Sequence, residues 1–152
     1  MHVVLMEPEI PPNTGNVSRT CAVTGTTLHL VEPLGFSIDD RQLKRAGLDY
    51  WHYLDLVIHR SQEDFFNSVP GGAFWLLTTK GSISYAEVAY GSDDYLVFGR
   101  ETAGLPESLL SRYPGRCVRI PMGKNVRSLN LSNAVAVVLY EALRQQGFPS
   151  MF

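Results

Sequence analysis

The chain has 152 residues, of which 45% are hydrophobic and 18% charged, with a formal net charge of −2 at pH 7. This length suits one domain with a core large enough to fold unaided, and the charge excludes a protein held on nucleic acid by bulk electrostatics alone. Because no apolar run approaches the roughly 20 residues of a membrane span and the N-terminus lacks a signal-peptide pattern, we expect one cytoplasmic domain over residues 1–152 without a membrane partner.

Apolar runs of strand type alternate with helical segments in the first half of the chain. Strands are predicted at residues 2–6, 27–31 and 57–59. Helices are predicted at 13–25, with Gly25 just past the end, at 39–46, and at 61–69 with Ser61 as N-cap.

The second half continues this alternation. Strands are predicted at 73–79, 95–98 and 117–120, and helices at 106–113 and 130–146. Ser84 and Glu87 have the spacing of a capping box. Strands that are apolar throughout and separated by helices indicate an α/β fold: one parallel sheet with helices on both faces.

Three loops follow predicted strands, at 7–16, 99–106 and 120–133. Ligands in open α/β sheets bind beyond the carboxyl ends of the strands, so these loops are the candidate site. The third is the most polar, with Lys124, Asn125, Arg127, Ser128, Asn130 and Asn133 just before an apolar helix. The alternative for this loop is a simple helix start, with Ser128 or Asn130 as N-cap.

Several common chemistries are poorly supported. Gly99 and Gly104 have phosphate-loop spacing, but no Lys-Ser/Thr follows them, and no Gly-x-Gly-x-x-Gly follows the first strand. The sequence contains no Gly-x-Ser-x-Gly elbow. The four histidines lack metal-ligand spacing and are better explained as surface or packing residues, while Cys21 and Cys117 are interpreted as core thiols. We therefore expect no metal.

Residues 13–19 (Asn-Thr-Gly-Asn-Val-Ser-Arg), 96–106 and 120–133 together resemble the three motifs of the SPOUT RNA 2′-O-methyltransferases. Segments 7–16, 45–50 and 77–81 resemble more closely the small branch that acts on the tRNA wobble nucleotide. The resemblance implies a C-terminal trefoil knot, which composition and periodicity do not show. It also implies methyl transfer from S-adenosyl-L-methionine to the ribose 2′-hydroxyl of cytidine or 5-carboxymethylaminomethyluridine at the wobble position of the tRNA anticodon stem-loop.

The same resemblance implies which residues hold this cofactor. They follow the strands predicted at 73–79, 95–98 and 117–120, and they are Leu77, Thr78, Gly99, Glu101, Ile120, Met122, Ser128 and Leu129. The chemistry is compatible, because apolar side chains can sandwich an adenine and a glycine lets the backbone approach a ligand closely.

Arg19, Glu101 and Asn130 are the implied catalytic residues. Arginine is almost always protonated, so we expect Arg19 to grip a phosphate bidentately and hold the ribose hydroxyl near the methyl group, rather than act as a base. Glu101 is expected to orient Asn16 or its own loop. Asn130 is expected to hold the hydroxyl or the loop, with helix capping as the alternative.

For RNA, the candidates are basic and aromatic residues, namely Arg41, Lys44, Arg45, Tyr50 and Arg127. The first three share one face of a short predicted helix, and a solvated face is the alternative. Lys124 and Arg100 would extend a basic rim near the cofactor. Many relatives have arginine where this chain has Ala103, which leaves individual contacts of the second loop open.

The resemblance covers nearly the whole chain, so we expect no RNA-binding extension and a homodimer that binds RNA across both subunits. The last helix would offer a partner the apolar stripe Val135, Val138, Leu139, Ala142 and Leu143, unless this stripe packs on its own sheet. Three other functions are weighed: a 2′-O-methyltransferase for another tRNA or rRNA position, a non-catalytic RNA-binding relative, and an unrelated nucleotide-binding or regulatory domain.

Overall fold

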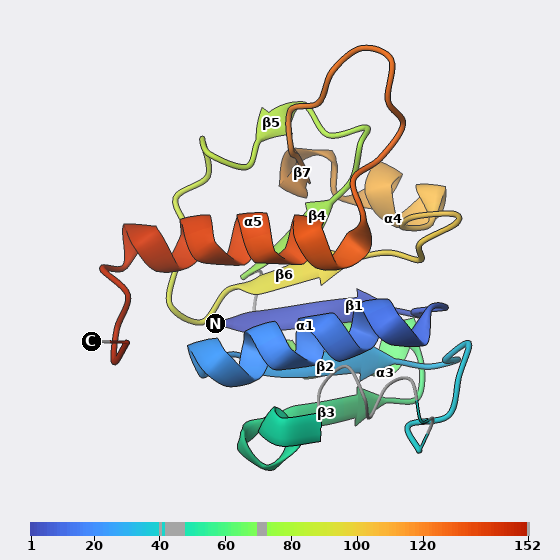
Figure 1. Cartoon of the computed structure of the whole chain (residues 1–152). Coiled ribbons are helices and arrows are strands. Elements are labelled where there is room, and N and C mark those ends of the chain that lie inside the picture. The colour runs from blue at the N-terminus through green and yellow to red at the C-terminus, as the bar shows by residue number, and fades with distance from the viewer. Residues whose placement is uncertain (40, 42–47, 70–72, 152) are drawn as a thin grey trace.

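One parallel sheet organises the computed structural model, which describes residues 1–39, 41, 48–69 and 73–151. Its order is β3-β2-β1-β6-β4-β7-β5, with every described pair of neighbouring strands parallel (Figure 1). The strands are β1 (His2–Met6), β2 (Thr27–Val31), β3 (Leu56–His59), β4 (Phe74–Leu77), β5 (Ile83–Ser84), β6 (Tyr95–Phe98) and β7 (Cys117–Arg119). Because these strands are parallel, the loops after β1, β4, β6 and β7 lie at one edge of the sheet.

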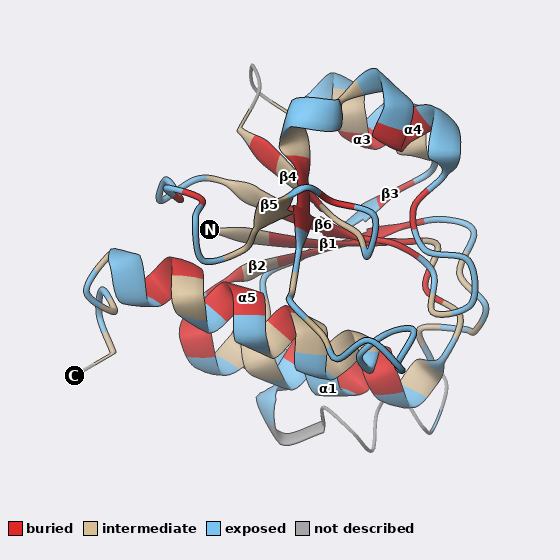
Figure 2. Cartoon of the chain, turned by 90° about the horizontal axis from the view of Figure 1, so that it is seen from above, coloured by how far each residue is buried: buried red, intermediate tan, exposed pale blue. Residues whose placement is uncertain are grey.

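Helices cover both faces of the sheet, as the α/β pattern predicts (Figure 2). Helices α1 (Pro11–Thr24) and α5 (Leu131–Gln145) share one apolar core with the sheet, and α3 (Gln62–Ser68) and α4 (Glu107–Arg112) share the other. Two short 3₁₀ helices are η1 (Leu48–Tyr53) and η2 (Pro114–Arg116). Side chains alternate between two cores, so the central strands β6 and β4 are apolar at every position.

Most predicted elements are confirmed, and their boundaries shift for local reasons. Helix α1 begins two residues earlier than predicted, because Pro11 and Pro12 occupy a first turn whose N–H groups need no intrahelical partner. Gly25 ends this helix in the left-handed conformation, with φ 62°. Ser61 is the N-cap of α3, and its Oγ accepts a hydrogen bond from Asp64 N at 3.0 Å.

The segment around Ser84 differs from the sequence prediction. Glu87 Oε2 accepts a hydrogen bond from Ser84 N at 3.0 Å, as in a capping box, but the chain makes only a turn and no helix. Ser84 instead ends the short strand β5, which sequence reasoning missed, because the strand has only two residues and one of them, Ser84, is polar. The helix predicted at 39–46 lies almost entirely outside the described residues.

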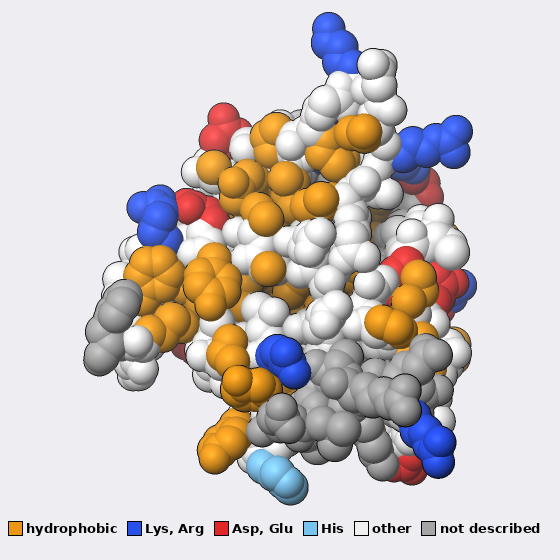
Figure 3. Space-filling model, in the orientation of Figure 1, with side chains coloured by type: hydrophobic (Ala, Val, Ile, Leu, Met, Phe, Trp, Pro, Cys, Tyr) orange, Lys and Arg blue, Asp and Glu red, His pale blue; other side chains and the backbone are white. Residues whose placement is uncertain are grey.

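The apolar stripe of α5 belongs to the core of its own chain, which corrects the dimer surface expected from the sequence. Its five residues, Val135, Val138, Leu139, Ala142 and Leu143, are at most 3% exposed. Other apolar side chains of α1 and α5 reach solvent: Val23 of α1 is 49% exposed, and Val137 and Tyr140 of α5 are 38% and 45% exposed. Figure 3 shows hydrophobic side chains gathered on the face that α1 and α5 form.

Three histidines form a chain of hydrogen bonds across β1, β2 and β3. His2 Nδ1 lies 3.1 Å from His29 Nε2, and His29 Nδ1 lies 2.9 Å from His59 Nε2. His29 and His59 are each only 6% exposed, and the edge of Phe65 packs against both rings. They are packing residues, one of the two roles that the sequence predicts. Burial, followed by the neighbouring His2 and His59, lowers the pKa of His29 to about 4.

This histidine chain predicts a loss of stability in mild acid. Because the pKa of His29 is lower in the folded than in the unfolded protein, its stabilising contribution is complete above the unfolded value of about 6.5 and disappears as the pH falls toward about 4. We expect the free energy of unfolding to fall by about 1–2 kcal/mol more in the wild type than in His29→Gln over this range. Urea unfolding at pH 7 and pH 4.5 measures the difference, with His52→Gln as the exposed control; equal pH dependence in His29→Gln would contradict the prediction.

Candidate active site

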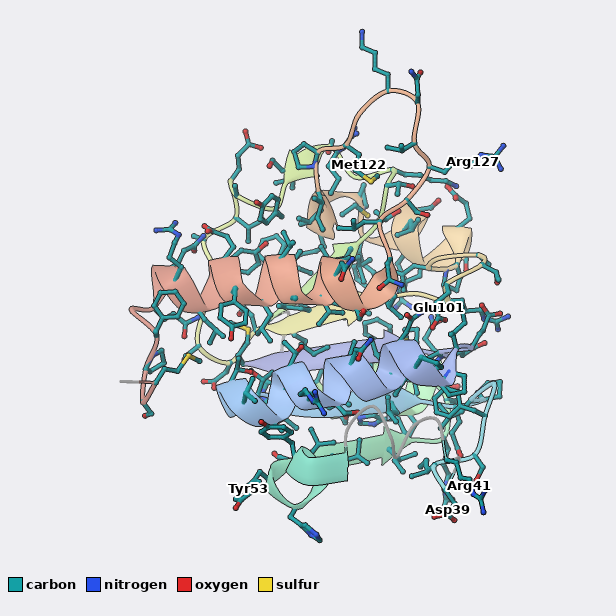
Figure 4. All side chains as sticks on the ribbon, viewed as in Figure 1. Asp39, Arg41, Tyr53, Glu101, Met122 and Arg127 are labelled. Carbon is teal, nitrogen blue, oxygen red and sulfur yellow. The ribbon has the colours of Figure 1, made fainter. Side chains whose placement is uncertain are left out.

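A cavity of about 510 Å³ lies at the carboxyl ends of β4, β6 and β7. Its walls come from the loops after these strands, from the residues just before and within the first turn of α1, and from the start of α5. All residues expected to hold the cofactor line it, namely Leu77, Thr78, Gly99, Glu101, Ile120, Met122, Ser128 and Leu129. Asn130 and Arg127 line it too, and Figure 4 shows Glu101, Met122 and Arg127 on the loops that surround it.

Glu101 joins the second loop to the first. Its carboxylate accepts hydrogen bonds from the backbone N–H groups of Glu9 at 2.9 Å and Ile10 at 3.2 Å, and from Asn13 Nδ2 at 3.2 Å. The sequence prediction that Glu101 orients Asn16, or the loop to which Glu101 itself belongs, is therefore wrong. Asn13 is 7% exposed and takes the place expected for Asn16, because it is the side chain on the inward face of the first helical turn.

Asn130 connects the third loop to the same residue. Its Nδ2 donates to Asn13 Oδ1 at 3.0 Å, while its Oδ1 caps α5 by accepting hydrogen bonds from Ser132 N at 3.0 Å and Asn133 N at 3.4 Å. Both capping and loop holding are thus found. Asn13 links Glu101 and Asn130, and sequence reasoning missed it as a site residue, although it opens the first motif.

The first and second loops are also held by charged side chains. The Glu9 carboxylate accepts hydrogen bonds from Thr102 N at 3.1 Å and Thr102 Oγ1 at 2.7 Å. Arg100 forms an ion pair with Glu7, so its charge is compensated within the chain. This corrects the expectation that Arg100 adds to a basic rim: Arg100, Lys124 and Arg127 are all exposed, but the charge of Arg100 is compensated by Glu7.

Gly99 is required by the chain itself. A Cβ at this position would lie 2.1 Å from Gly104 C and 2.2 Å from Leu105 N. The backbone folds back here, with Arg100 and Gly104 exchanging both of their N–H···O=C hydrogen bonds at 3.2 and 2.9 Å. The close approach expected between Gly99 and a ligand is therefore first of all an approach to its own loop.

Arg19 lies outside the cavity lining. It is exposed in the third turn of α1, six residues beyond Asn13, which is about 9 Å along the helix axis at 1.5 Å per residue. Its guanidinium carbon lies 5.3 Å from the ring centroid of Tyr50 in η1.

The other residues expected to contact RNA are spread along the molecule. Arg41 and Arg127 are both exposed, and Figure 4 shows them well apart, with Glu101 between them in that view. Lys44 and Arg45 lie outside the described residues. Tyr50 is 38% exposed. The structure therefore brings together the residues expected to bind the cofactor, while the basic residues it describes do not form one compact cluster.

The cavity fits S-adenosylmethionine in size and chemistry. Its volume lies within the roughly 300–1,000 Å³ of small-molecule sites. A nucleoside with an amino-acid tail needs apolar walls for the base, which Leu77, Ile120 and Leu129 can provide, and polar groups for the ribose and tail, which the loop backbones and Ser128 can provide. No group of three or more His, Cys, Asp or Glu side chains in the described part of the chain is arranged to hold a metal ion.

Comparison with known proteins identifies the family. A model of the SpoU rRNA methylase family matches residues 1–140. The chain belongs to this family. It is 54% identical to the tRNA (cytidine(34)-2′-O)-methyltransferase of Methylovorus glucosotrophus over 147 residues, covering 96% of both chains.

Solved structures of SpoU and related methyltransferases share this fold. One, described as giving structural insights into the 2-OH methylation of C/U34 on tRNA, has 48% identity and a TM-score of 0.92 over 96% of this chain and 95% of its own. The SpoU methyltransferase AviRb from Streptomyces viridochromogenes, in complex with the cofactor AdoMet, has 25% identity and a TM-score of 0.83 over 96% of this chain and 60% of its own. The predicted fold and family are confirmed, while the trefoil knot stays a prediction.

None of the described helices has the length and apolarity needed to cross a membrane.

Proposed function

We propose that the protein is a tRNA 2′-O-methyltransferase that transfers a methyl group from S-adenosylmethionine to the ribose 2′-hydroxyl of nucleotide 34, in the cytoplasm. The observation that carries this proposal is the single cavity lined by the whole expected cofactor set, in a chain similar over its length to proteins named for cytidine 34 methylation. S-adenosylmethionine supplies an electrophilic methyl group on its sulfonium. The protein's task is to hold the cofactor and bring one hydroxyl to it.

Within this function, Glu101 and Asn130 shape the site through Asn13. Both Glu101 oxygens are engaged by neighbouring N–H groups, so this carboxylate is placed to hold the loops rather than to accept a substrate proton. Asn130 fixes the start of α5 and with it the backbone of Ser128 and Leu129 at the cavity wall. Hydrogen bonds therefore join the first loop, the second loop and α5, and cofactor binding is expected to depend on all three.

Arg19 acts on the RNA rather than on the cofactor. An arginine fork binds a phosphate bidentately without losing its proton, and its place on α1 is separated from the cavity by about two helical turns. A phosphate held there would leave the attached ribose free to reach the cavity mouth. Arg41, Lys44, Arg45 and Arg127 are proposed to bind the rest of the anticodon stem-loop.

The tRNA substrate can be tested directly. Mapping of 2′-O-methylation in tRNA from cells lacking the gene should show a methyl group missing at nucleotide 34, restored by the wild-type gene. A methyl group missing instead from another tRNA or rRNA position would select the alternative substrate.

Cofactor binding can be tested without RNA. Calorimetry with a chelator present should show binding of S-adenosylmethionine or S-adenosylhomocysteine; strict dependence on a divalent ion would count against the proposal.

A homodimer would bury the apolar side chains that α1 and α5 leave exposed. Val23, Val137 and Tyr140 lie on neighbouring helices of one face, and a two-fold axis lets the same patch serve both copies. Val23 lies ten residues beyond Asn13 on α1, and Val137 and Tyr140 lie seven and ten residues beyond Asn130, so the patch is centred on the later turns of both helices.

Charge placed in this patch is expected to separate the dimer. Light scattering at micromolar concentration should give about twice the 16.9 kDa chain mass for the wild type and about the chain mass for Tyr140→Asp. Ile58→Asp, at an equally exposed apolar residue on the edge strand β3, is the control that should stay dimeric. A wild-type monomer that methylates tRNA at full rate would exclude the dimer.

A further inference from the structure

An aromatic ring lies against the guanidinium of Arg19. The Tyr50 ring centroid is 5.3 Å from the Arg19 guanidinium carbon, within the roughly 6 Å of a cation–π contact. The two residues come from α1 and from η1, which are separated by strand β2 in the sequence and pack together in the fold. Arg19 is exposed and Tyr50 is 38% exposed, so both face solvent where an RNA would approach.

The geometry of a guanidinium decides what this contact can do. Its positive charge is attracted by the face of an aromatic ring, while its N–H donors lie in its own plane and point past the ring edge. Stacking therefore restricts the long, rotamer-rich side chain and leaves the donors available for a phosphate. Among the carboxylates that the structure describes, no ion pair with Arg19 is found, so the ring is its described partner.

We propose that Tyr50 is a positioning residue for Arg19, which holds the guanidinium ready for the RNA phosphate before the substrate binds. The proposal rests on the role of Arg19 in the proposed function. It differs from base stacking, the role that the sequence suggests for Tyr50, because the ring face that contacts Arg19 is already occupied in the free protein. Arg19 is one of several groups proposed to hold the tRNA, but it is the one proposed to place the ribose, so pre-ordering it should mainly speed the methyl-transfer step.

The first experiment is single-turnover methyl transfer to an anticodon-bearing tRNA at saturating cofactor. Tyr50→Leu removes the ring and is expected to lower the maximal rate roughly two- to fivefold, the size of an exposed cation–π contact, with little change in the tRNA concentration at half-maximal rate. Tyr50→Phe keeps the ring face and should recover most of the rate. Tyr53→Leu, at a 77% exposed tyrosine three residues further along η1, is the matched control.

A double-mutant cycle tests whether Tyr50 works through Arg19. In an Arg19→Ala background, Tyr50→Leu should have almost no further effect on the rate, whereas independent roles would give multiplied losses. A raised half-maximal tRNA concentration with an unchanged maximal rate would overturn the proposal in favour of base stacking. A full rate in Tyr50→Leu would overturn it as well.

A readout without activity separates this inference from the proposed function. In the free protein, the ring should shift the NMR signals of the Arg19 side chain upfield; Tyr50→Phe should keep this shift and Tyr50→Leu remove it. An unshifted Arg19 signal would overturn the positioning role even in an active enzyme. A shifted signal in a protein that methylates no tRNA would leave the contact intact and contradict the proposed function instead.

Discussion

Arg19→Ala is expected to lower the single-turnover rate of tRNA methylation by about 10²-fold or more, because the ribose hydroxyl loses the group that holds it near the methyl donor. The affinity for S-adenosylmethionine should stay almost unchanged, since Arg19 does not line the cavity and lies about 9 Å along α1 from Asn13, which does. Rate and cofactor affinity are measured on the same preparations, at saturating cofactor and by calorimetry.

Two further variants define what the arginine contributes. Arg19→Lys should recover little of the rate, because a point charge cannot reproduce a bidentate, stacked guanidinium. Arg112→Ala is the matched control, since Arg112 of α4 also lies 5.3 Å from a tyrosine ring, that of Tyr113, and belongs to no proposed contact with RNA or cofactor. Wild-type rates in Arg19→Ala would remove Arg19 from the catalytic residues.

Gly99→Ala is expected to weaken S-adenosylmethionine binding by about ten- to a hundredfold. The added Cβ would lie 2.1 to 2.4 Å from backbone atoms of Gly104 and Leu105, so the loop must shift, and overpacking of this kind costs about 1–3 kcal/mol. That loop forms one wall of the cavity and carries Glu101, so the shift reaches the cofactor directly.

The control for this prediction is a glycine with room around it. A Cβ at Gly115 would meet no atom within 4 Å, so Gly115→Ala should bind the cofactor like the wild type. Calorimetric titration compares the two variants, and thermal unfolding shows that each is folded. Wild-type affinity in Gly99→Ala would mean that the loop between Arg100 and Leu105 tolerates displacement and does not form the cofactor wall.

The local features of this chain were predictable from the sequence. Apolar runs marked the strands β1, β2 and β6 at their observed bounds, and Ser61 and Gly25 marked helix ends, because strand burial and helix capping depend on neighbouring residues. The residues that the family resemblance assigns to the cofactor line one cavity, because the loops that carry them follow strands ending at the same edge of the sheet. Their binding of the cofactor stays a prediction.

Contacts between distant segments were not predictable in this way. Asn13 joins Glu101 and Asn130 across 88 and 117 positions of the chain, and no spacing rule connects residues so far apart. Arg100 was expected to add its charge to a basic rim near the cofactor, but the fold places Glu7 beside it and the two form an ion pair. Motif resemblance named Arg19, but only the packing of η1 on α1 brought Tyr50 against it.

The sequence by itself therefore determined most of the elements and their parallel arrangement, because these follow from periodicity and capping residues within short segments, and its loop motifs carried the family resemblance. Strand β5 and the order of the strands in the sheet were not predicted. Tertiary structure alone decided which polar groups are paired and which apolar faces are covered. The stripe on α5 shows the reason: its pattern predicts an apolar face but cannot say whether the sheet or a second copy covers it, and here the sheet does.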